Sequence, residues 1–366
     1  MKHHHTVPSH RSAHNHSLSA LFICRVSEQS ENTNYGYFRR HSGLLNSAKF
    51  VADMLTAQGH RSLAITANDN NDIDRLVTLH SPKYVFIEAL WVVPEKFDEL
   101  KALHPHVIWV IRLHSQLPFL ATEGVAVEWI FECLHKDNVY IAPNTLELTG
   151  NLQSLLPVEL QSKVVYLPNY YPVDTPDVKH AIVVGNQVKS HYDDCEIHIG
   201  CFGAIRPLKN QLPQAFAALK FADSHGFKLS FHINSDRVES GQSNLRNIRT
   251  LFDMMPDHTL VEHEWVPHKA FLEIVATMNL GMQVSYSESF NIVTADMVAT
   301  GVPVVTSSEV SWVYPGYYAD PNKVDSMVAA LNRAYITRHV KGHHLNKRRL
   351  RNYSLQSVKI WLAAIG

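Results

Sequence analysis

The chain has 366 residues, which is long for a single hydrophobic core and suggests two domains of ordinary size. Its formal net charge of −1, with 18% charged residues, gives no general attraction to nucleic acid or anionic membranes, so a polyanion would have to bind a local patch. The four cysteines lack a CxxC pair, and no stretch approaches the ~18 apolar residues of a membrane span. We therefore expect a cytoplasmic protein without a disulfide framework, a zinc ribbon or a membrane-spanning helix.

The first half of the chain predicts a Rossmann-like domain. Residues 1–19 are polar and rich in histidine, without the apolar run of a secretion signal, and we expect them to be a disordered tail. From residue 20, short apolar runs alternate with helical segments as far as residue 172. Strands separated by helices of this length pair in parallel through βαβ crossovers, so residues 20–172 predict an open sheet covered on both faces. The expected strands are 20–26, 62–66, 84–90, 107–113 and 139–144.

The same alternation returns in the second half. Residues 171–196 interrupt it with prolines and a mixed polar run, which is typical of a linker with one embedded strand. Residues 173–352 predict a second Rossmann-like domain, and 353–366 a C-terminal helix that returns to the first domain. Two such domains in tandem predict an α/β protein whose sheets face each other across a cleft, where open parallel sheets bind ligands.

A basic loop is expected at that cleft. Neither GxxxxGK[ST] nor a GxGxxG after the first strand is present, which disfavours a P-loop NTPase and a nicotinamide dehydrogenase. Instead, GAIRPLKNQ at 203–211 follows the first expected strand of the second domain. Gly203 permits close backbone approach, while Arg206 and Lys209 offer two cations for a diphosphate. The alternative is that both cations are simply solvated.

A second candidate segment is SESFNIVTADMVATGVPVV at 287–305. It predicts a loop, a helix over 294–300 ended by Gly301, and a short strand. Asp296 is expected in the first helical turn and Glu288 in the preceding loop, where both carboxylates could meet sugar hydroxyls. The alternative is a helix-dipole partner and a solvated loop residue. A helix start with free backbone N–H groups can hold a phosphate, here at Phe290, Asn291, Ile292 and Val293.

Together these segments resemble a known family. GAIRPLKN at 203–210, followed by HEWVPHKAFLEIVATMNLGMQVSYSESFNIVTADMVATGVPVV at 263–305, resembles the C-terminal half of GT-B glycosyltransferases of the large retaining family 4. The resemblance implies that Glu288 lies near the donor sugar, that Arg206 and Lys209 hold the diphosphate, and that Asp296 binds the nucleotide ribose. Two features depart from the family: the second acid is Asp instead of Glu, and Arg206 lies two positions later than the usual Gly-Arg pair.

The N-terminal half resembles the same family. RRHSGLLNSAKFVADMLTAQGH at 39–60 is similar to its glycine-bearing first loop and helix, which implies that Ser42 and Gly43 approach the donor phosphate or the acceptor. VIRLHSQLP places His114 after a strand, where family members often carry a histidine near the reacting sugar. Outside that family context, an ordinary hydrogen-bonded histidine would be the more usual interpretation.

The resemblance also implies a nucleotide-sugar donor, a UDP-sugar before a GDP-sugar, with no permanent cofactor and no metal. Candidate metal motifs agree with that expectation. Asp72-Ile73-Asp74 precedes an expected helix and is interpreted as a cap, and the histidine-containing segments 191–198 and 263–265 lack a metal-ligand spacing.

The acceptor is the least determined part of the function. The loop 32–41 combines aromatic rings, which can stack on a base or sugar, with guanidinium groups, which can neutralise phosphate: Tyr35, Tyr37, Phe38, Arg39 and Arg40. The N-terminal half also resembles glycosyltransferases of large tailed phages, some of which modify 5-hydroxymethylcytosine in DNA, and this implies a DNA base as acceptor. A polysaccharide or lipid-linked saccharide acceptor, and a non-catalytic GT-B-like binding protein, are the alternatives. The basic run 341–351 is interpreted as a solvated helix face or a nucleic-acid contact.

Overall fold

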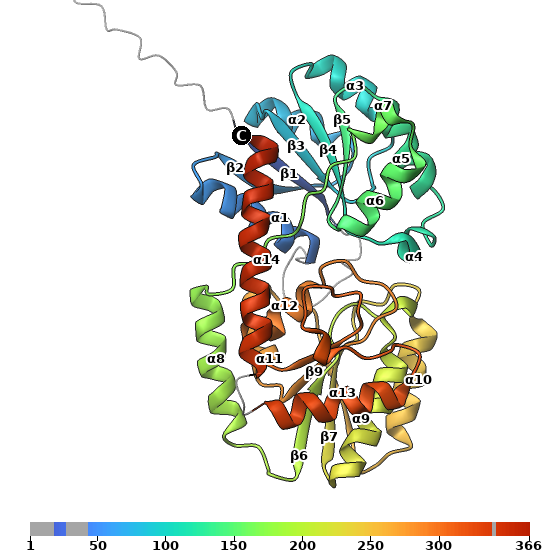
Figure 1. The fold of residues 1–366 in the computed structure, drawn as a ribbon, viewed down its shortest axis with the longest axis vertical. Helices are drawn as coiled ribbons and strands as arrows, with labels where there is room; N and C mark the ends of the chain where they lie inside the picture. The colour runs from blue at the N-terminus through green and yellow to red at the C-terminus, as the bar shows by residue number, and fades with distance from the viewer. Residues whose placement is uncertain (1–17, 27–42, 339–341) are drawn as a thin grey trace, which may run out of the picture.

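The computed structural model describes residues 18–26, 43–338 and 342–366, which form two α/β domains stacked along the long axis of the molecule (Figure 1). The first domain contains a parallel sheet in the order β2-β1-β3-β4-β5. All five expected strands are present, as β1 (Ala20–Arg25), β2 (Ser62–Ala67), β3 (Tyr84–Glu88), β4 (Ile108–Leu113) and β5 (Val139–Pro143). The register of β3 and β4 places Glu88 beside Arg112.

Helices cover both faces of this sheet because its strands carry apolar side chains on both sides. One face, with Phe22 and Phe86, packs against α1 (Gly43–Ala57). The other face, with Leu21 and Trp109, packs against helices that contribute Ile73, Phe97 and Ile130. These and the remaining helices of the domain are α2 (Asp72–His80), α3 (Lys96–Leu103), α4 (Leu117–Leu120), α5 (Ala126–His135), α6 (Leu146–Leu155) and α7 (Val158–Gln161).

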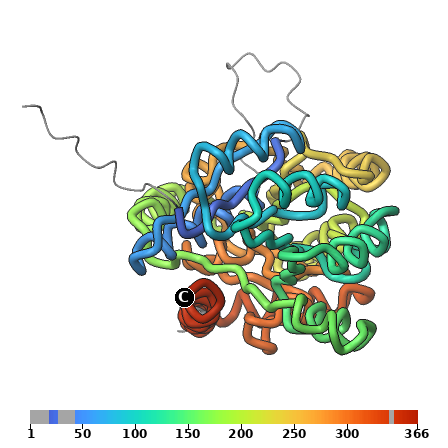
Figure 2. Tube along the Cα trace, turned by 90° about the horizontal axis from the view of Figure 1, so that it is seen from above, coloured from blue at the N-terminus to red at the C-terminus, as the bar shows by residue number. Residues whose placement is uncertain are grey.

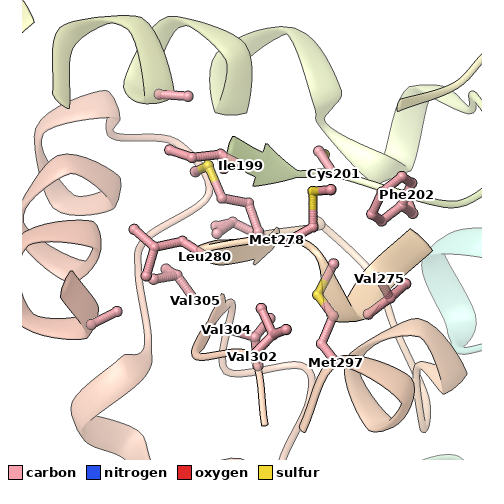
Figure 3. Close-up of a cluster of buried hydrophobic side chains, with 14 of the residues drawn as sticks. Ile199, Cys201, Phe202, Val275, Met278, Leu280, Met297, Val302, Val304 and Val305 are labelled. Carbon is pink, nitrogen blue, oxygen red and sulfur yellow. The ribbon is translucent and has the colours of Figure 1, made fainter. Parts of the chain in front are cut away.

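The second domain repeats the architecture, with strand order β10-β9-β6-β7-β8. Its strands are β6 (Glu196–Gly200), β7 (Lys228–Asn234), β8 (Thr259–His263), β9 (Leu280–Gln283) and β10 (Val304–Thr306). Its helices include α9 (Gln211–His225), α10 (Gln242–Asp253), α11 (His268–Ala276), α12 (Ile292–Ala299) and α13 (Val324–Thr337). Figure 3 shows Met297 from α12 packed close to β9 and β10. A Cβ at Gly281 would lie 2.2 Å from the sulfur of Met297, so this contact requires glycine.

The segment between the domains differs from the sequence prediction. Instead of a strand it contains α8 (Pro176–Lys189), capped by Thr175, whose hydroxyl accepts from the Val178 N–H at 3.2 Å. The Thr-Pro pair is a helix-start signal, but the β-branched run after it favoured a strand in the prediction. Gly185 lets α8 approach α11 closely, since a Cβ there would lie 2.3 Å from the Ala276 carbonyl oxygen.

The C-terminal helix α14 (Gly342–Ile365) runs along both domains, at the outer edge of the molecule when seen from above (Figures 1 and 2). Trp361 is fully buried against Phe22 and Phe86 of the first domain and donates to the Pro168 carbonyl at 2.8 Å. The predicted return of this helix to the first domain is therefore confirmed. No helix in the described part of the chain combines the length and apolarity needed to cross a bilayer.

The basic run on α14 is used within the molecule. Arg351 forms a two-point ion pair with Asp174, and Lys347 donates to the Ala299 carbonyl at 2.9 Å. Arg349 donates to the Trp312 carbonyl at 2.8 Å. These contacts hold the first turns of α14 against the second domain and the linker, so Lys347, Arg349 and Arg351 each have a partner within the protein.

Candidate functional site

Loops that follow the carboxyl ends of strands in both domains meet at two pockets. The Asp296 pocket is lined by Gly43 and Asn46 from α1 and, from the second domain, by Gly203, Asn234, Trp265, Val266, His268, Phe271, Ile292, Val293 and Asp296. The Glu288 pocket is lined by His114, Ser115, Gln116 and Phe119 from the first domain and by Arg206, Leu208, Lys209, Ser287, Glu288 and Ser289 from the second. The fold thus brings together most of the predicted site residues that the structure describes.

The helix that carries Asp296 starts earlier than expected. α12 begins at Ile292 because Asn291, at φ 55°, caps it: its side-chain oxygen accepts from the Thr294 N–H at 2.9 Å. Asn is a preferred N-cap and tolerates the left-handed conformation, so the signal was present in the sequence. The correction moves Asp296 out of the first turn into the second. Phe290 is buried and its carbonyl accepts from Trp312, whereas Ile292 and Val293 line the Asp296 pocket.

Asp296 is already bound within the protein. Its Oδ1 accepts from the Tyr171 hydroxyl and from His268 Nε2, each at 2.7 Å, and the side chain is buried. Tyr171 and His268 also both contact the ring of Phe50 on α1. Burial lowers the pKa of His268, but the Asp296 carboxylate raises it by more, so the net shift is upward. Asp296 therefore joins the interdomain linker to α11 through Oδ1, and Oδ2 is the oxygen that a ligand hydroxyl would meet.

The two predicted cations have different partners. Lys209 Nζ lies 2.5 Å from Glu288 Oε1, so two predicted residues form one ion pair. Arg206 is paired with Glu239, which also binds Arg237 at 2.6 Å. The Arg206 guanidinium also lies 5.1 Å from the centre of the Phe119 ring in the first domain, a cation–π contact across the interface. A diphosphate would have to compete with a carboxylate for each cation.

Gly203 and Gly43 lie on the two sides of the Asp296 pocket, and only Gly203 has a backbone conformation that favours glycine. Gly203 adopts φ 115°, a conformation that favours glycine, and its N–H donates to Asn234 at 2.9 Å. Gly43 begins α1 and faces Ile292 of the second domain, where an added Cβ would lie 3.4 Å from the Ile292 side chain. The two glycines line the Asp296 pocket from opposite domains.

His114 lies in a buried polar cluster that the sequence did not reveal. Its Nε2 is 2.5 Å from Glu88 Oε2, and Arg112 Nη1 is 2.8 Å from Glu88 Oε1. Burial raises the pKa of Glu88, and the two neighbours lower it by more, so the carboxylate stays ionised. Charged residues at the ends of apolar strands 84–88 and 108–113 were the available signal, but only the strand register shows that they meet.

A hydroxyl connects the two domains beside the Glu288 pocket. Ser289 donates to the His114 carbonyl at 2.8 Å and accepts from Asn144 Nδ2 at 3.0 Å. Near them, Glu309 interacts with Glu147 and Glu288, and Glu123 with Arg206. Burial raises the pKa of Glu309, and the two neighbouring carboxylates raise it further. Acidic side chains therefore lie close to this pocket, beside the cations Arg206 and Lys209 that line it.

Several predicted residues lie outside the described residues: Ser42 and the proposed acceptor-binding residues Tyr35, Tyr37, Phe38, Arg39 and Arg40. The interpretation of Asp72 and Asp74 as helix caps is wrong: Asp69 accepts from the Asn71 N–H at 2.7 Å and from the Asp72 N–H at 3.3 Å at the start of α2, because its carboxylate precedes the first turn. Asp72 instead accepts from the Asn68 backbone N–H at 2.8 Å, and Asp74 lies 2.8 Å from His104. Within the described ranges, no group of three or more His, Cys, Asp or Glu residues is arranged to hold a metal ion.

No protein-family model matches this sequence, and no curated protein matches it by sequence similarity. The fold, however, matches solved structures over almost its whole length. The N-terminal domain of trehalose-6-phosphate phosphatase from Candida albicans has a TM-score of 0.66 at 10% identity, covering 94% of this chain and 96% of its own. A UDP-forming α,α-trehalose-phosphate synthase from Burkholderia vietnamiensis has a TM-score of 0.65 at 11% identity, covering 96% and 97%.

The catalytic domain of starch synthase IV from Arabidopsis thaliana, bound to ADP and acarbose, has a TM-score of 0.63 at 10% identity and covers 95% of this chain and 99% of its own. At such identities the likeness establishes the fold. It is the GT-B fold of glycosyltransferases, in which two Rossmann-like domains face each other across a cleft. The fold predicted from the sequence resemblance is therefore confirmed.

Proposed function

We propose that this protein is a glycosyltransferase that moves a sugar from a nucleotide-sugar, a UDP-sugar before a GDP-sugar, to a hydroxyl acceptor. The observation that carries the proposal is the Lys209–Glu288 ion pair in a pocket between two domains of a GT-B fold. The pair places a cation for a diphosphate next to a carboxylate for a sugar. The UDP-forming trehalose-phosphate synthase and the starch synthase with bound ADP, which have this fold, support the proposal.

In the proposed complex the diphosphate replaces the carboxylate that each of the two cations binds in the structure. Lys209 leaves Glu288 and Arg206 leaves Glu239 to bind phosphate oxygens, joined by the backbone N–H groups at the start of α12. The freed Glu288 carboxylate then faces the donor sugar, and Asp296 Oδ2 binds the ribose. We propose transfer with retention at the anomeric carbon, as the family 4 resemblance implies, without a metal.

The acceptor that we propose first is 5-hydroxymethylcytosine in DNA, flipped out of the duplex onto Tyr35, Tyr37, Phe38, Arg39 and Arg40. A neutral saccharide is the second candidate, and one observation favours it. The carboxylates of Glu123, Glu147 and Glu309 near the Glu288 pocket would repel a polyanion at this side of the cleft.

Nucleotide binding tests the donor half of the proposal. UDP, GDP and ADP are added separately, and thermal unfolding and the hydrolysis of UDP-sugars are measured. We expect at least one nucleotide to raise the melting temperature and Lys209→Ala to remove most of that shift. Lys220→Ala, which removes an exposed ion pair with Asp325, is the matched control and should behave as the wild type. No stabilisation by any of the three nucleotides would contradict the proposal.

The hydrolysis measurement separates an enzyme from a binding protein, because slow donor hydrolysis requires a working site. Binding without any hydrolysis or transfer would favour a non-catalytic GT-B-like binding protein. We expect hydrolysis to persist in EDTA, and strict metal dependence would contradict the proposed chemistry. Mass spectrometry of nucleosides after incubation with UDP-sugars and hydroxymethylated DNA then tests the acceptor, with neutral oligosaccharides as the parallel arm.

A further inference from the structure

A buried ion pair lies directly beneath the Glu288 pocket. Glu88 ends β3 and Arg112 lies beside it on β4, both with side chains that are 0% exposed. Arg112 also donates to Asn169 at 3.4 Å and lies 5.0 Å from the ring centre of Trp361. Removing two charges from water is costly even when they are paired, so the ion pair is weak evidence for a contribution to stability.

The third member of the cluster is His114, whose protonation the geometry defines. An ionised carboxylate only accepts hydrogen bonds, so the 2.5 Å contact with Glu88 requires the hydrogen on Nε2. Burial lowers the pKa of His114 and the charge of Glu88 only partly offsets it, so the ring is neutral near pH 7. A neutral ring with hydrogen on Nε2 carries a lone pair on Nδ1.

Two backbone features hold this arrangement in place. Ala89, directly after Glu88, adopts φ 72°, a strained conformation for alanine, and its N–H donates to the Arg112 carbonyl at 3.0 Å. The His114 carbonyl accepts from Ser289 of the opposite domain at 2.8 Å. Within the ranges that the structure describes, no hydrogen bond to His114 Nδ1 is recorded, and His114 lines the Glu288 pocket.

We infer that Glu88 is a positioning residue that fixes His114 in its Nε2–H tautomer, so that Nδ1 accepts a hydrogen bond from a hydroxyl of the ligand in the Glu288 pocket. A lone pair attracts a hydroxyl and repels phosphate or carboxylate oxygens, so this position selects the sugar part of a ligand over its anionic part. The ligand contact rests on the proposed function, whereas the tautomer does not.

The charged groups around His114 come from both domains. Glu88 and Arg112 face it from β3 and β4, and the Cys24 thiol of β1 lies beside Glu88 in the sheet. Arg206, Lys209 and Glu288 line the same pocket from the second domain. Since Glu88 raises the pKa of His114 more than Arg112 lowers it, removal of both charges should lower this pKa further.

Nuclear magnetic resonance of the ring nitrogens tests the tautomer without any activity. The His114 signals are assigned by their loss in His114→Gln, and the wild type should show hydrogen on Nε2 and a neutral ring at pH 7. The double variant Glu88→Leu with Arg112→Met removes both charges of the ion pair, so that neither charge is left buried without a partner. In this variant we expect a mixture of the two His114 tautomers. Glu88→Gln with Arg112→Met keeps an accepting oxygen and should restore the Nε2–H form. A charged ring, an Nδ1–H form in the wild type, or an unchanged tautomer in the Leu variant would overturn the inference.

The pH profile of donor hydrolysis tests the contact with the ligand. The Leu variant should lose about tenfold or more in kcat, with its acidic limb at lower pH than in the wild type, and the Gln variant should recover most of kcat. A purely structural role of Glu88 would lower the melting temperature of both variants alike and leave the acidic limb in place. If the wild type shows no hydrolysis, the proposed function fails while the resonance experiment still decides the tautomer.

Discussion

At the scale of single residues, Asp296 combines contacts within the protein with a place in a pocket. An aspartate is one methylene shorter than the glutamate usual in the family that the sequence resembles, which keeps the carboxylate close to α12, where Tyr171 and His268 both reach Oδ1. The residue is therefore part of the connection between the linker and α11 as well as of the Asp296 pocket. The departure from the family pattern is accompanied by two buried hydrogen bonds within the protein.

Asp296→Ala is expected to lower both stability and nucleotide affinity. The stability should fall by about 1–3 kcal/mol, because two buried donors lose their acceptor, and the affinity for UDP about tenfold. Denaturant unfolding and titration calorimetry measure the two effects. Tyr171→Phe, which removes one of the bonds but no ligand contact, should reduce stability alone, and an equal loss of affinity in that variant would contradict a direct role of Asp296.

Glu288 and His114 are the residues that we expect to matter most for turnover. Glu288→Ala and His114→Ala should each lower kcat about 10²-fold or more with little effect on nucleotide affinity, since both side chains line the sugar end of the proposed site. Steady-state transfer kinetics check this expectation. Glu159→Ala, which removes an exposed carboxylate of α7, serves as the control and should retain full turnover.

At the scale of elements, α14 is one of the structural connections between the two domains. Its first turns bind Asp174, Ala299 and Trp312, and its last turns place Trp361 in the core of the first domain. A helix of this composition has little tendency to form alone, so these tertiary contacts at both ends determine its position. The same contacts give three side chains of the basic run 341–351 a partner within the protein.

Trp361→Ala should therefore destabilise the protein by about 3–5 kcal/mol, because it leaves a cavity between Phe22 and Phe86 and an unpaired Pro168 carbonyl. The free energy of unfolding in urea is the measurement. Leu355→Ala removes a side chain that is 63% exposed on the same helix, and it should change the free energy by less than about 0.5 kcal/mol. Similar losses in both variants would show that the helix itself, and not the buried ring, is responsible.

At the scale of the whole molecule, three histidines cross the second sheet and link its stability to pH. His198 on β6 lies 3.0 Å from His232 on β7, which lies 2.8 Å from His263 on β8. The pKa of each of the three histidines is lowered, mainly by burial, and that of His232 falls to about 3. The unfolded chain binds protons at these sites near pH 6.5 and the folded chain does not, so protonation favours unfolding.

The free energy of unfolding should consequently decrease as the pH falls from about 6.5 towards 3, by about 1.4 kcal/mol per pH unit for each excess proton bound by the unfolded chain. The amide of His232→Gln can still form hydrogen bonds with His198 and His263. This variant should reduce the slope by up to the contribution of one proton. Urea unfolding at a series of pH values measures the slope, with the exposed His106→Gln as the control. An unchanged slope in His232→Gln would show that other groups cause acid unfolding.

The sequence by itself determined the alternation of strands and helices, the parallel sheets, the GT-B resemblance and the proximity of Arg206, Lys209 and Glu288, whereas Asp296 lines a separate pocket. Those features are encoded locally, in apolar periodicity and in the Gly, Pro and Asn residues that end or begin elements. The local signals were misinterpreted where Thr175-Pro176 starts a helix and where Asn291 begins α12.

Only the tertiary structure decided which charges meet. Glu88, Arg112 and His114 become one cluster through the register of β3 and β4, and Arg206 pairs with Glu239 because two loops of the second domain lie side by side. Asp296 likewise meets Tyr171 only where the linker crosses α12. Electrostatic interactions depend on distance in space and on burial, and neither is encoded in the spacing of residues along the chain.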